Sequence, residues 1–317
     1  MALYILRRLL WLGPALFFIS LVTFLLMHAT PGGPYEQDPR LPQSTIDSMN
    51  RKYGLDEPLW RQYTIFLGNA LQGDLGISLK VQQNQPVTPL LLERLRSTLV
   101  LGSAAFAVAA AAGIALGIAS ALNRNRLPDY GAVLVATGGA ALPAFVVGVL
   151  MIYVFATQLH LLPTQGWNTA SGLLPGWLPE PKQMLLPVIT LALLPLAYLA
   201  RITRASLLEV LGQDYMRTAR AKGLSQHSVV WQHGMRNAAI PIVSVMGPVA
   251  GALLTGSFVV ENMFGVPGVG TLFVRAVAAR DYNLIMGMTL FYATVALVLY
   301  LVVDVAYAYL DPRVRYR

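Results

Sequence analysis

Charged and small residues follow one another in a fixed order between two strongly apolar segments, in the stretch DYMRTARAKGLSQHSVVWQHGMRNAAIP that begins at Asp214. Asp214 is a suitable N-cap, and Tyr215 to Lys222 are mostly good helix formers. Gly223 follows where a helix end favours a residue that tolerates positive φ, and Ser225 can cap a second helix. The sequence therefore predicts a helix, a glycine bend and a second helix that runs toward Pro241.

The chemistry of this stretch suits contact with another protein surface. Ala219 and Ala221 are small enough to let a partner backbone approach the first helix closely, while Arg217, Arg220 and Lys222 supply positive charge beside them. Nothing in the stretch has the spacing of a catalytic group. We therefore expect docking at this place, not a reaction.

Reactive motifs are missing from the sequence. The chain has no cysteine, so it forms no disulfide and offers no thiolate to a metal. It contains neither a G-x-S-x-G elbow nor an H-E-x-x-H pair, and no G-x-x-x-x-G-K-[ST] phosphate loop. Four histidines show no metal-ligand spacing: His28, His160, His227 and His233.

Composition indicates an integral membrane protein. Of 317 residues, 56% are hydrophobic and 12% are charged, whereas soluble domains carry about 25% charged residues. Six apolar segments reach the roughly 20 residues that a membrane helix needs. The predicted spans are 9–27, 98–122, 131–158, 183–200, 238–260 and 284–303. We therefore expect an all-α polytopic fold, least certain at 183–200, which Pro187 and Pro195 interrupt.

The distribution of charge predicts the orientation. Arg7 and Arg8 precede the first span as in an uncleaved signal anchor, and placing them inside leaves only Lys182, Arg275 and Arg280 in the two short outer loops. Basic residues gather in cytoplasmic loops, so both termini and the stretch from Asp214 are expected in the cytoplasm. This bias also accounts for the net charge of +8 without nucleic acid.

Residues 29–97 are mixed in composition and predict a small ordered extracytoplasmic region. Two short helices are expected there, one from Ser44 closed by Gly54 and one after Glu57. The chain is thus divided into 1–97 (signal anchor plus this region) and 98–317, a five-helix core with a cytoplasmic loop at about 201–237.

Pairs of glycines four residues apart mark close helix contacts. Gly113 with Gly117, and Gly247 with Gly251, have the small-xxx-small spacing that lets membrane helices approach. Packing within the chain, a subunit interface and a pathway lining remain open as explanations.

The order of residues from Arg217 to Gly223 resembles the coupling loop of importer-type ABC transporter permeases. That family's motif is Glu-Ala-Ala, three residues, then Gly; here Arg217 and Thr218 replace the first two positions, so the Glu is absent. The string RTARAKG, with HxxRNAxxP after it, is similar to the dipeptide, oligopeptide and nickel branch. A merely basic loop would explain the charge but not this order.

The last outer loop, ENMFGVPGVG, also resembles an element of this family, ExxFxxPGxG. Its glycines and proline impose a compact turn. Two interpretations stay open: a collar at the outer mouth near a docked binding protein, or a rigid turn without substrate contact. The matching residues are Glu261, Phe264, Pro267, Gly268 and Gly270.

The resemblance covers the whole chain and is strongest to the first permease subunit of oligopeptide importers. It implies a non-enzymatic subunit of the bacterial inner membrane that pairs with a second homologous permease, two ABC ATPases and an extracytoplasmic peptide-binding protein. ATP and Mg²⁺ would bind the ATPases, and this chain would bind no cofactor. The residues expected to contact an ATPase are Asp214, Tyr215, Arg217, Thr218, Ala219, Arg220, Ala221, Lys222 and Gly223.

Other functions are weighed beside this one. The cargo could instead be dipeptides, nickel chelates, glutathione or antimicrobial peptides. A secondary transporter without ATPases would favour paired intramembrane charges or inverted repeats, and neither is evident. A purely structural scaffold gives the ordered loop no role.

Overall fold

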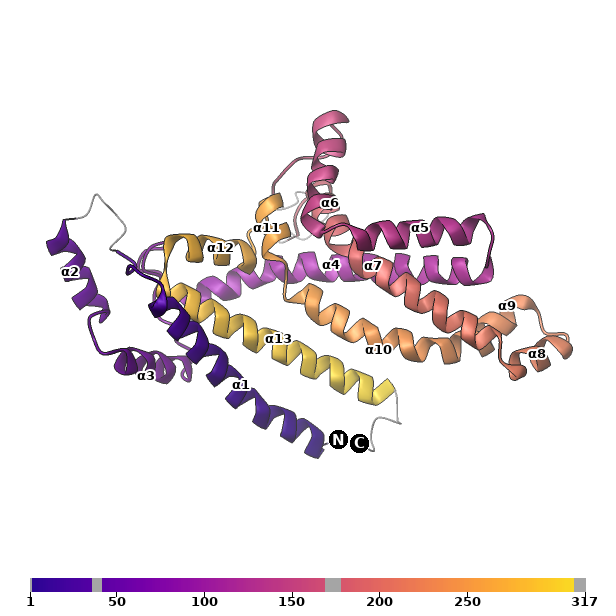
Figure 1. Cartoon of the computed structure of the whole chain (residues 1–317), viewed down its shortest axis with the longest axis horizontal. Helices are drawn as coiled ribbons and strands as arrows, with labels where there is room; N and C mark the ends of the chain where they lie inside the picture. The colour runs from indigo at the N-terminus through magenta and orange to yellow at the C-terminus, as the bar shows by residue number, and fades with distance from the viewer. Residues whose placement is uncertain (1, 36–41, 169–177, 311–317) are drawn as a thin grey trace. The chain divides into compact units, whose positions relative to one another are not determined.

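The computed structural model describes residues 2–35, 42–168 and 178–310. These residues are helical apart from turns, loops and isolated β-bridge residues, among them the pair Ile77 and Pro86 (Figure 1). Two compact units are present: Met1–Thr98 with Pro267–Val298, here the first unit, and Leu99–Val266 with Leu299–Arg317, here the second unit. The helices are α1 (Ala2–Ala29), α2 (Gln43–Tyr53), α3 (Leu59–Ala70), α4 (Val87–Leu122), α5 (Leu127–Ala141), α6 (Ala144–Met151), η1 (Ile152–Gln158), α7 (Pro181–Leu211), α8 (Asp214–Ala221), α9 (Gln226–Ser228), η2 (Val229–Gly234), α10 (Met235–Leu254), α11 (Phe258–Phe264), α12 (Val269–Ala279) and α13 (Tyr282–Leu310), where η marks π-helix.

The predicted all-α membrane fold is confirmed. Within the described residues, five helices are long and apolar enough to cross a membrane, or up to seven spans if each of two bent helix pairs counts as one. The five lie in α1, α4, α7, the run from α9 to α10, and α13. The expected six spans fall inside this range.

The predicted span 131–158 is not one straight helix. The structure breaks it into α5 and α6–η1, which are bent by 106°. Pro143 explains the break, because proline lacks the N–H that would continue α5 and pushes the residue before it out of the helical region. Leu142 is accordingly extended, with φ −103° and ψ 132°.

The doubtful segment 183–200 is a continuous helix. α7 runs through both Pro187 and Pro195 from Pro181 to Leu211. Half of its most apolar window is buried inside the chain, the highest share of the five spans. Interior prolines are tolerated in membrane helices when neighbouring helices hold the kinked segment in place, as this burial does here.

α4 begins eleven residues before the apolar segment that predicted it, at Val87 instead of 98. Its first turns belong to the first unit, where Val87, Leu90 and Leu91 join a buried cluster with Val269, Leu272 and Leu284. Glu93, Arg94 and Arg96 lie in these turns, so the start of α4 carries too little hydropathy to be recognised as part of a span.

The two short helices expected in residues 29–97 are present as α2 and α3. Gly54 ends α2 in the left-handed conformation (φ 66°), as predicted. Ser44 is not the cap, however, because α2 starts at Gln43 after Pro42 and makes no side-chain cap.

A buried carboxylate organises the loop that follows these helices. Asp281 is fully buried and accepts hydrogen bonds from the Ser78 hydroxyl (2.6 Å) and from the amides of Leu79 (3.0 Å), Lys80 (2.9 Å) and Val81 (3.1 Å). One side chain on the turn before α13 thus fixes the path of a segment about 200 residues earlier in the chain.

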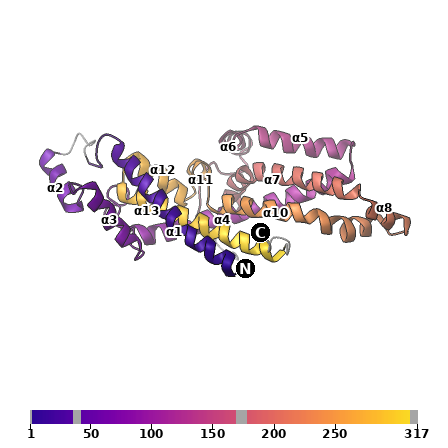
Figure 2. The same cartoon turned by 60° about the horizontal axis from the view of Figure 1, so that its bottom comes forward.

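Close backbone contacts hold the second unit together. A Cβ added at Gly113 would lie 2.8 Å from the carbonyl oxygen of Leu196, and one at Gly117 would lie 2.6 Å from that of Ala200. Gly251 likewise packs on the ring of Tyr300, at 2.8 Å. For these glycines the structure supports packing within the chain. α5, α7 and α10 lie side by side in both views (Figure 1 and Figure 2).

Replacing Gly117 by alanine is expected to lower the stability of the protein by about 1–3 kcal/mol, the usual cost of overpacking. The added methyl would press on the Ala200 carbonyl and on the Thr203 side chain. Thermal unfolding in detergent measures the change. Gly131→Ala is the control, since nothing lies within 4 Å of its Cβ position; equal midpoints for the two variants would contradict the expectation.

Candidate functional site

The helix predicted after Asp214 is α8, and it ends as predicted. Its last turn closes at Lys222, and Gly223 follows with φ +76°, a conformation that only glycine adopts without strain. Asp214 does not cap the helix: Gln213 holds the N-cap position, and Asp214 lies in the first turn. Its carboxylate still favours this end through the helix dipole.

α8 is anchored to the ends of two longer helices. Met216 is fully buried and Ala219 is nearly so. With Val229 of η2 they form a buried cluster, against which Val210 and Leu211 of α7 pack. A polar contact adds to this anchor, because the Asn237 amide donates a 2.8 Å hydrogen bond to the Tyr215 hydroxyl. Any force on α8 therefore acts on the end of α7 and on the start of α10 together.

The opposite face of α8 is open. The side chains of Asp214 and Arg217 are 95% and 75% exposed, and their 3.5 Å ion pair is therefore weak. Thr218 donates to the Asp214 carbonyl (3.1 Å), and Arg220, Ala221 and Lys222 are exposed. Since Ala219 is used inside the chain, Ala221 is the alanine of the pair that a partner could approach.

The second helix of the stretch is also confirmed. Ser225 caps it by accepting a hydrogen bond from the Ser228 amide (3.3 Å). The helix then passes through the π-helical segment η2 and continues as α10 beyond Pro241, to Leu254. π-Helical segments are rare and often mark functional sites, and no residue pattern had indicated this one.

Sequence reasoning missed the apolar residues of this site. Met216 and Ala219 have the i, i+3 spacing of one helix face, which could have identified the buried anchor. Trp231 is 50% exposed and Leu224 is 41% exposed. Together with half-exposed Tyr215, they add apolar contact area to the basic surface. Such a mixture is typical of protein contact sites.

A buried ion pair joins three helices of the second unit. Arg204 on α7 donates to both carboxylate oxygens of Asp129 on α5, from Nε at 2.8 Å and from a terminal nitrogen at 2.9 Å. Ser120 near the end of α4 donates to Asp129 and accepts from Arg204 Nε (2.9 Å). The backbone N–H of Asn125 donates a further 2.9 Å hydrogen bond to the Asp129 carboxylate. No motif in the sequence singles out these four residues.

The outer-loop motif is divided between the units. In the second unit, Glu261 and Phe264 on α11 are buried, and the amide of Gly166 and the side chain of Gln165 donate to carbonyls at the end of α11. In the first unit, Pro267 and Gly268 precede α12, which contains buried Gly270. Glu261 and Phe264 are therefore shielded from any substrate in this conformation.

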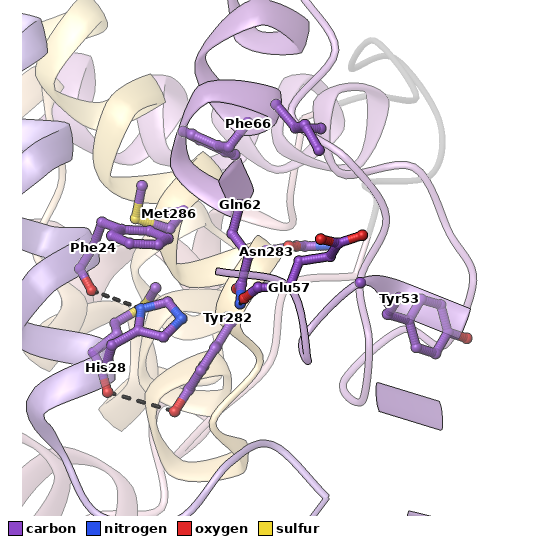
Figure 3. A pocket seen from close by; sticks show the side chains of 12 residues that line it. Phe24, His28, Tyr53, Glu57, Gln62, Phe66, Tyr282, Asn283 and Met286 are labelled. Carbon is purple, nitrogen blue, oxygen red and sulfur yellow. Dashed lines mark hydrogen bonds between the residues drawn. The ribbon is translucent and has the colours of Figure 1, made fainter. Parts of the chain in front are cut away.

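The first unit contains a cavity of about 190 Å³ between the end of α1, the α2–α3 turn and the start of α13 (Figure 3). His28 donates a hydrogen bond from Nδ1 to the Phe24 carbonyl (2.9 Å), and its ring meets that of Tyr282 edge-on. Ligand pockets usually measure about 300–1,000 Å³. This cavity would hold a single side chain but not a peptide.

The described residues hold no group of three histidine, cysteine, aspartate or glutamate side chains that could bind a metal ion.

Comparison with known proteins identifies the class of protein. Residues 113–316 match the family described as the binding-protein-dependent transport system inner membrane component, and residues 1–102 match the N-terminal domain of such membrane components. The chain belongs to this family: it is a multi-pass permease subunit of the inner membrane.

Individual relatives extend over the full length. The dipeptide transport system permease protein DppB of Bacillus subtilis is 37% identical over 99% of this chain and 98% of its own. The glutathione transport system permease protein GsiC of Escherichia coli K12 is 41% identical over 99% of both. The predicted resemblance is confirmed.

Solved structures support the fold alone. A crystal structure of an amino acid ABC transporter matches with a TM-score of 0.53 and 18% identity, over 71% of this chain and 94% of that one. An inward-facing MetNI methionine ABC transporter matches with a TM-score of 0.53 and 13% identity, over 70% and 96%.

Replacing Met216 by alanine is expected to loosen α8, because losing a buried methionine side chain costs about 2–5 kcal/mol. Amide hydrogen exchange should then be faster in α8, while exchange in the middle of α7 stays slow. Arg217→Ala is the control, since that side chain is mostly exposed. Equal protection of α8 in the two variants would show that Met216 is not its anchor.

Proposed function

We propose that this chain forms one half of the membrane pathway of an ATP-driven peptide importer, and that α8 is its contact with an ATPase subunit. The observation that carries the proposal is the two-sided construction of α8. Its apolar side is buried on α7 and η2, while its polar side is exposed in the order that resembles the coupling loop.

The proposed mechanism needs no reactive group in this chain. ATP binding closes the two ATPases and displaces the surface on which α8 rests. Because buried Met216 and Ala219 tie α8 to α7 and to the η2–α10 run, the displacement passes to these helices as a rigid-body movement. The pathway between the two permeases then opens alternately to each side. ATP and Mg²⁺ stay on the ATPases.

Membership of a binding-protein-dependent family implies partners that supply ATP hydrolysis and substrate capture. We infer a complex with a second homologous permease, two ATPases and an extracytoplasmic peptide-binding protein. Both termini and α8 lie on the cytoplasmic side in this proposal, supported by the excess of arginine and lysine in the loops assigned there.

The cargo in this proposal is a peptide, with oligopeptides as the specific class. The relatives named for dipeptide and for glutathione transport support short peptides in general. The binding protein would set most of the preference. Uptake into proteoliposomes of the whole complex tests the class, with a labelled pentapeptide, labelled dialanine and labelled glutathione compared as substrates. Uptake of the pentapeptide is expected; uptake of dialanine or of glutathione without uptake of the pentapeptide would replace oligopeptides with that cargo.

Replacing Gly223 by leucine is expected to lower uptake at least tenfold with normal membrane insertion. Nothing lies within 4 Å of its Cβ position, so the effect would come from forcing a side chain into φ +76° at the end of α8. Gly73→Leu is the matched control, since Gly73 has φ +82° and an equally open Cβ position. Unchanged uptake in the Gly223 variant would remove this bend from the mechanism.

Reversing the charge of Arg220 is expected to weaken the contact with the ATPases. Affinity purification of a tagged chain from membranes should recover the ATPases with the wild type and with Lys52→Glu, which reverses an exposed charge on α2. Recovery should fall with Arg220→Glu. A wild-type chain that transports substrate alone, without ATPases, would instead establish a secondary transporter.

A further inference from the structure

We propose that Arg204, Asp129 and Ser120 form a joint that makes the start of α5 follow the movement of the coupling helix α8. The inference rests on the proposed function of α8. It assigns a positioning role to three residues that lie outside the coupling stretch.

The joint lies close to α8 along one continuous helix. Arg204 and Leu211 are both in α7, which ends at Leu211, and Asp214 opens α8 three residues later. Seven residues of helix span about 10 Å at 1.5 Å each. The last two turns of α7 thus connect the Arg204 side chain with Leu211, which packs on the buried cluster that anchors α8.

The apolar seam between α5 and α7 consists of small side chains. It contains Ala136 of α5 and Ala197 and Ala200 of α7, which are all buried, and Gly139 packs against Leu193 and Ala197. Small side chains let the helices approach closely, but they interlock little. Such a seam holds two helices together and resists sliding only weakly.

The polar joint fixes the position of α5 along α7, which the apolar seam does not. The guanidinium fork of Arg204 reaches both oxygens of Asp129, and paired charge-assisted bonds of this kind fix orientation as well as distance. Asp129 is 4% exposed, so water competes little for it. Ser120 and the Asn125 amide bind the same carboxylate, which brings α4, the α4–α5 turn and α5 to one point on α7.

α4 is held on α7 independently by the contacts of Gly113 and Gly117. Near the turn, the buried side chains of α5 are those of Asp129 and Ala132, so the apolar contact there is small. Loss of the Asp129 charge should therefore release the start of α5 from α7 without separating α4 from it. A variant of this kind keeps the fold and changes only how α5 follows α8.

Distances between spin labels test the joint in the complete complex. The chain has no cysteine, so Tyr130→Cys on the exposed face at the start of α5 and Gln213→Cys beside α8 place two unique labels. Pulsed electron resonance should give the same distance in the nucleotide-free and the ATP-bound complex of the otherwise unchanged chain. With Asp129→Asn added, the distance should shift between the two states.

Arg201→Gln is the matched control, because it removes an exposed arginine from α7 one turn before Arg204. It should behave like the parent chain. The proposal is overturned if the parent distance itself changes between the states, or if Asp129→Asn keeps the parent distance in both. A chain that does not assemble with ATPases would refute the proposed function instead.

A disulfide that locks α5 to α7 provides a second test of the joint. A Cβ added at Gly139 would lie 3.5 Å from that of Ala197, a separation compatible with a disulfide. Oxidation of Gly139→Cys with Ala197→Cys should leave binding-protein-stimulated ATP hydrolysis unchanged, as in the single Ala197→Cys control, because α5 and α7 move together. A loss on oxidation that reduction reverses would show that they must slide, and would overturn the joint.

Discussion

Close contact between helix backbones is the constraint on which the second unit depends. Lipid tails are as apolar as leucine, so membrane helices gain little from hiding apolar side chains from one another and associate through packing and polar contacts. Gly113 and Gly117 let α4 lie directly on the carbonyls of α7, and Gly102 does the same against Leu253 of α10. α7 and its neighbours can therefore transmit displacement, because closely packed helices deform little.

The proposed function of the chain depends on this rigidity. In the proposed mechanism a partner protein moves the permease. The contact helix must then be fixed to the rest of the chain on one face and exposed to the partner on the other, and α8 has both properties. Met216 provides the first through complete burial, and the exposed charges around Arg217 provide the second. No reactive side chain is required in this mechanism.

Much of this arrangement could be predicted from local sequence. The glycine after Lys222, the cap at Ser225 and the helix closed by Gly54 were all identified correctly, because each depends on a few neighbouring residues. The break at Pro143 was missed although proline gave a signal, because the same residue type is absorbed without a break in α7. Whether a proline bends a membrane helix depends on tertiary packing, which one sequence does not reveal.

The two buried carboxylates show most clearly what cannot be predicted from the sequence. Asp281 is satisfied by a hydroxyl and a row of backbone amides, whereas Asp129 is satisfied by an arginine. In the sequence, Asp129 counted as one acid among cytoplasmic charges, and Asp281 stood next to Arg280 in an outer loop. Their partners lie about 75 and 200 residues away. A buried charge must be paired, so each forces distant segments to meet, and only the folded chain reveals which ones.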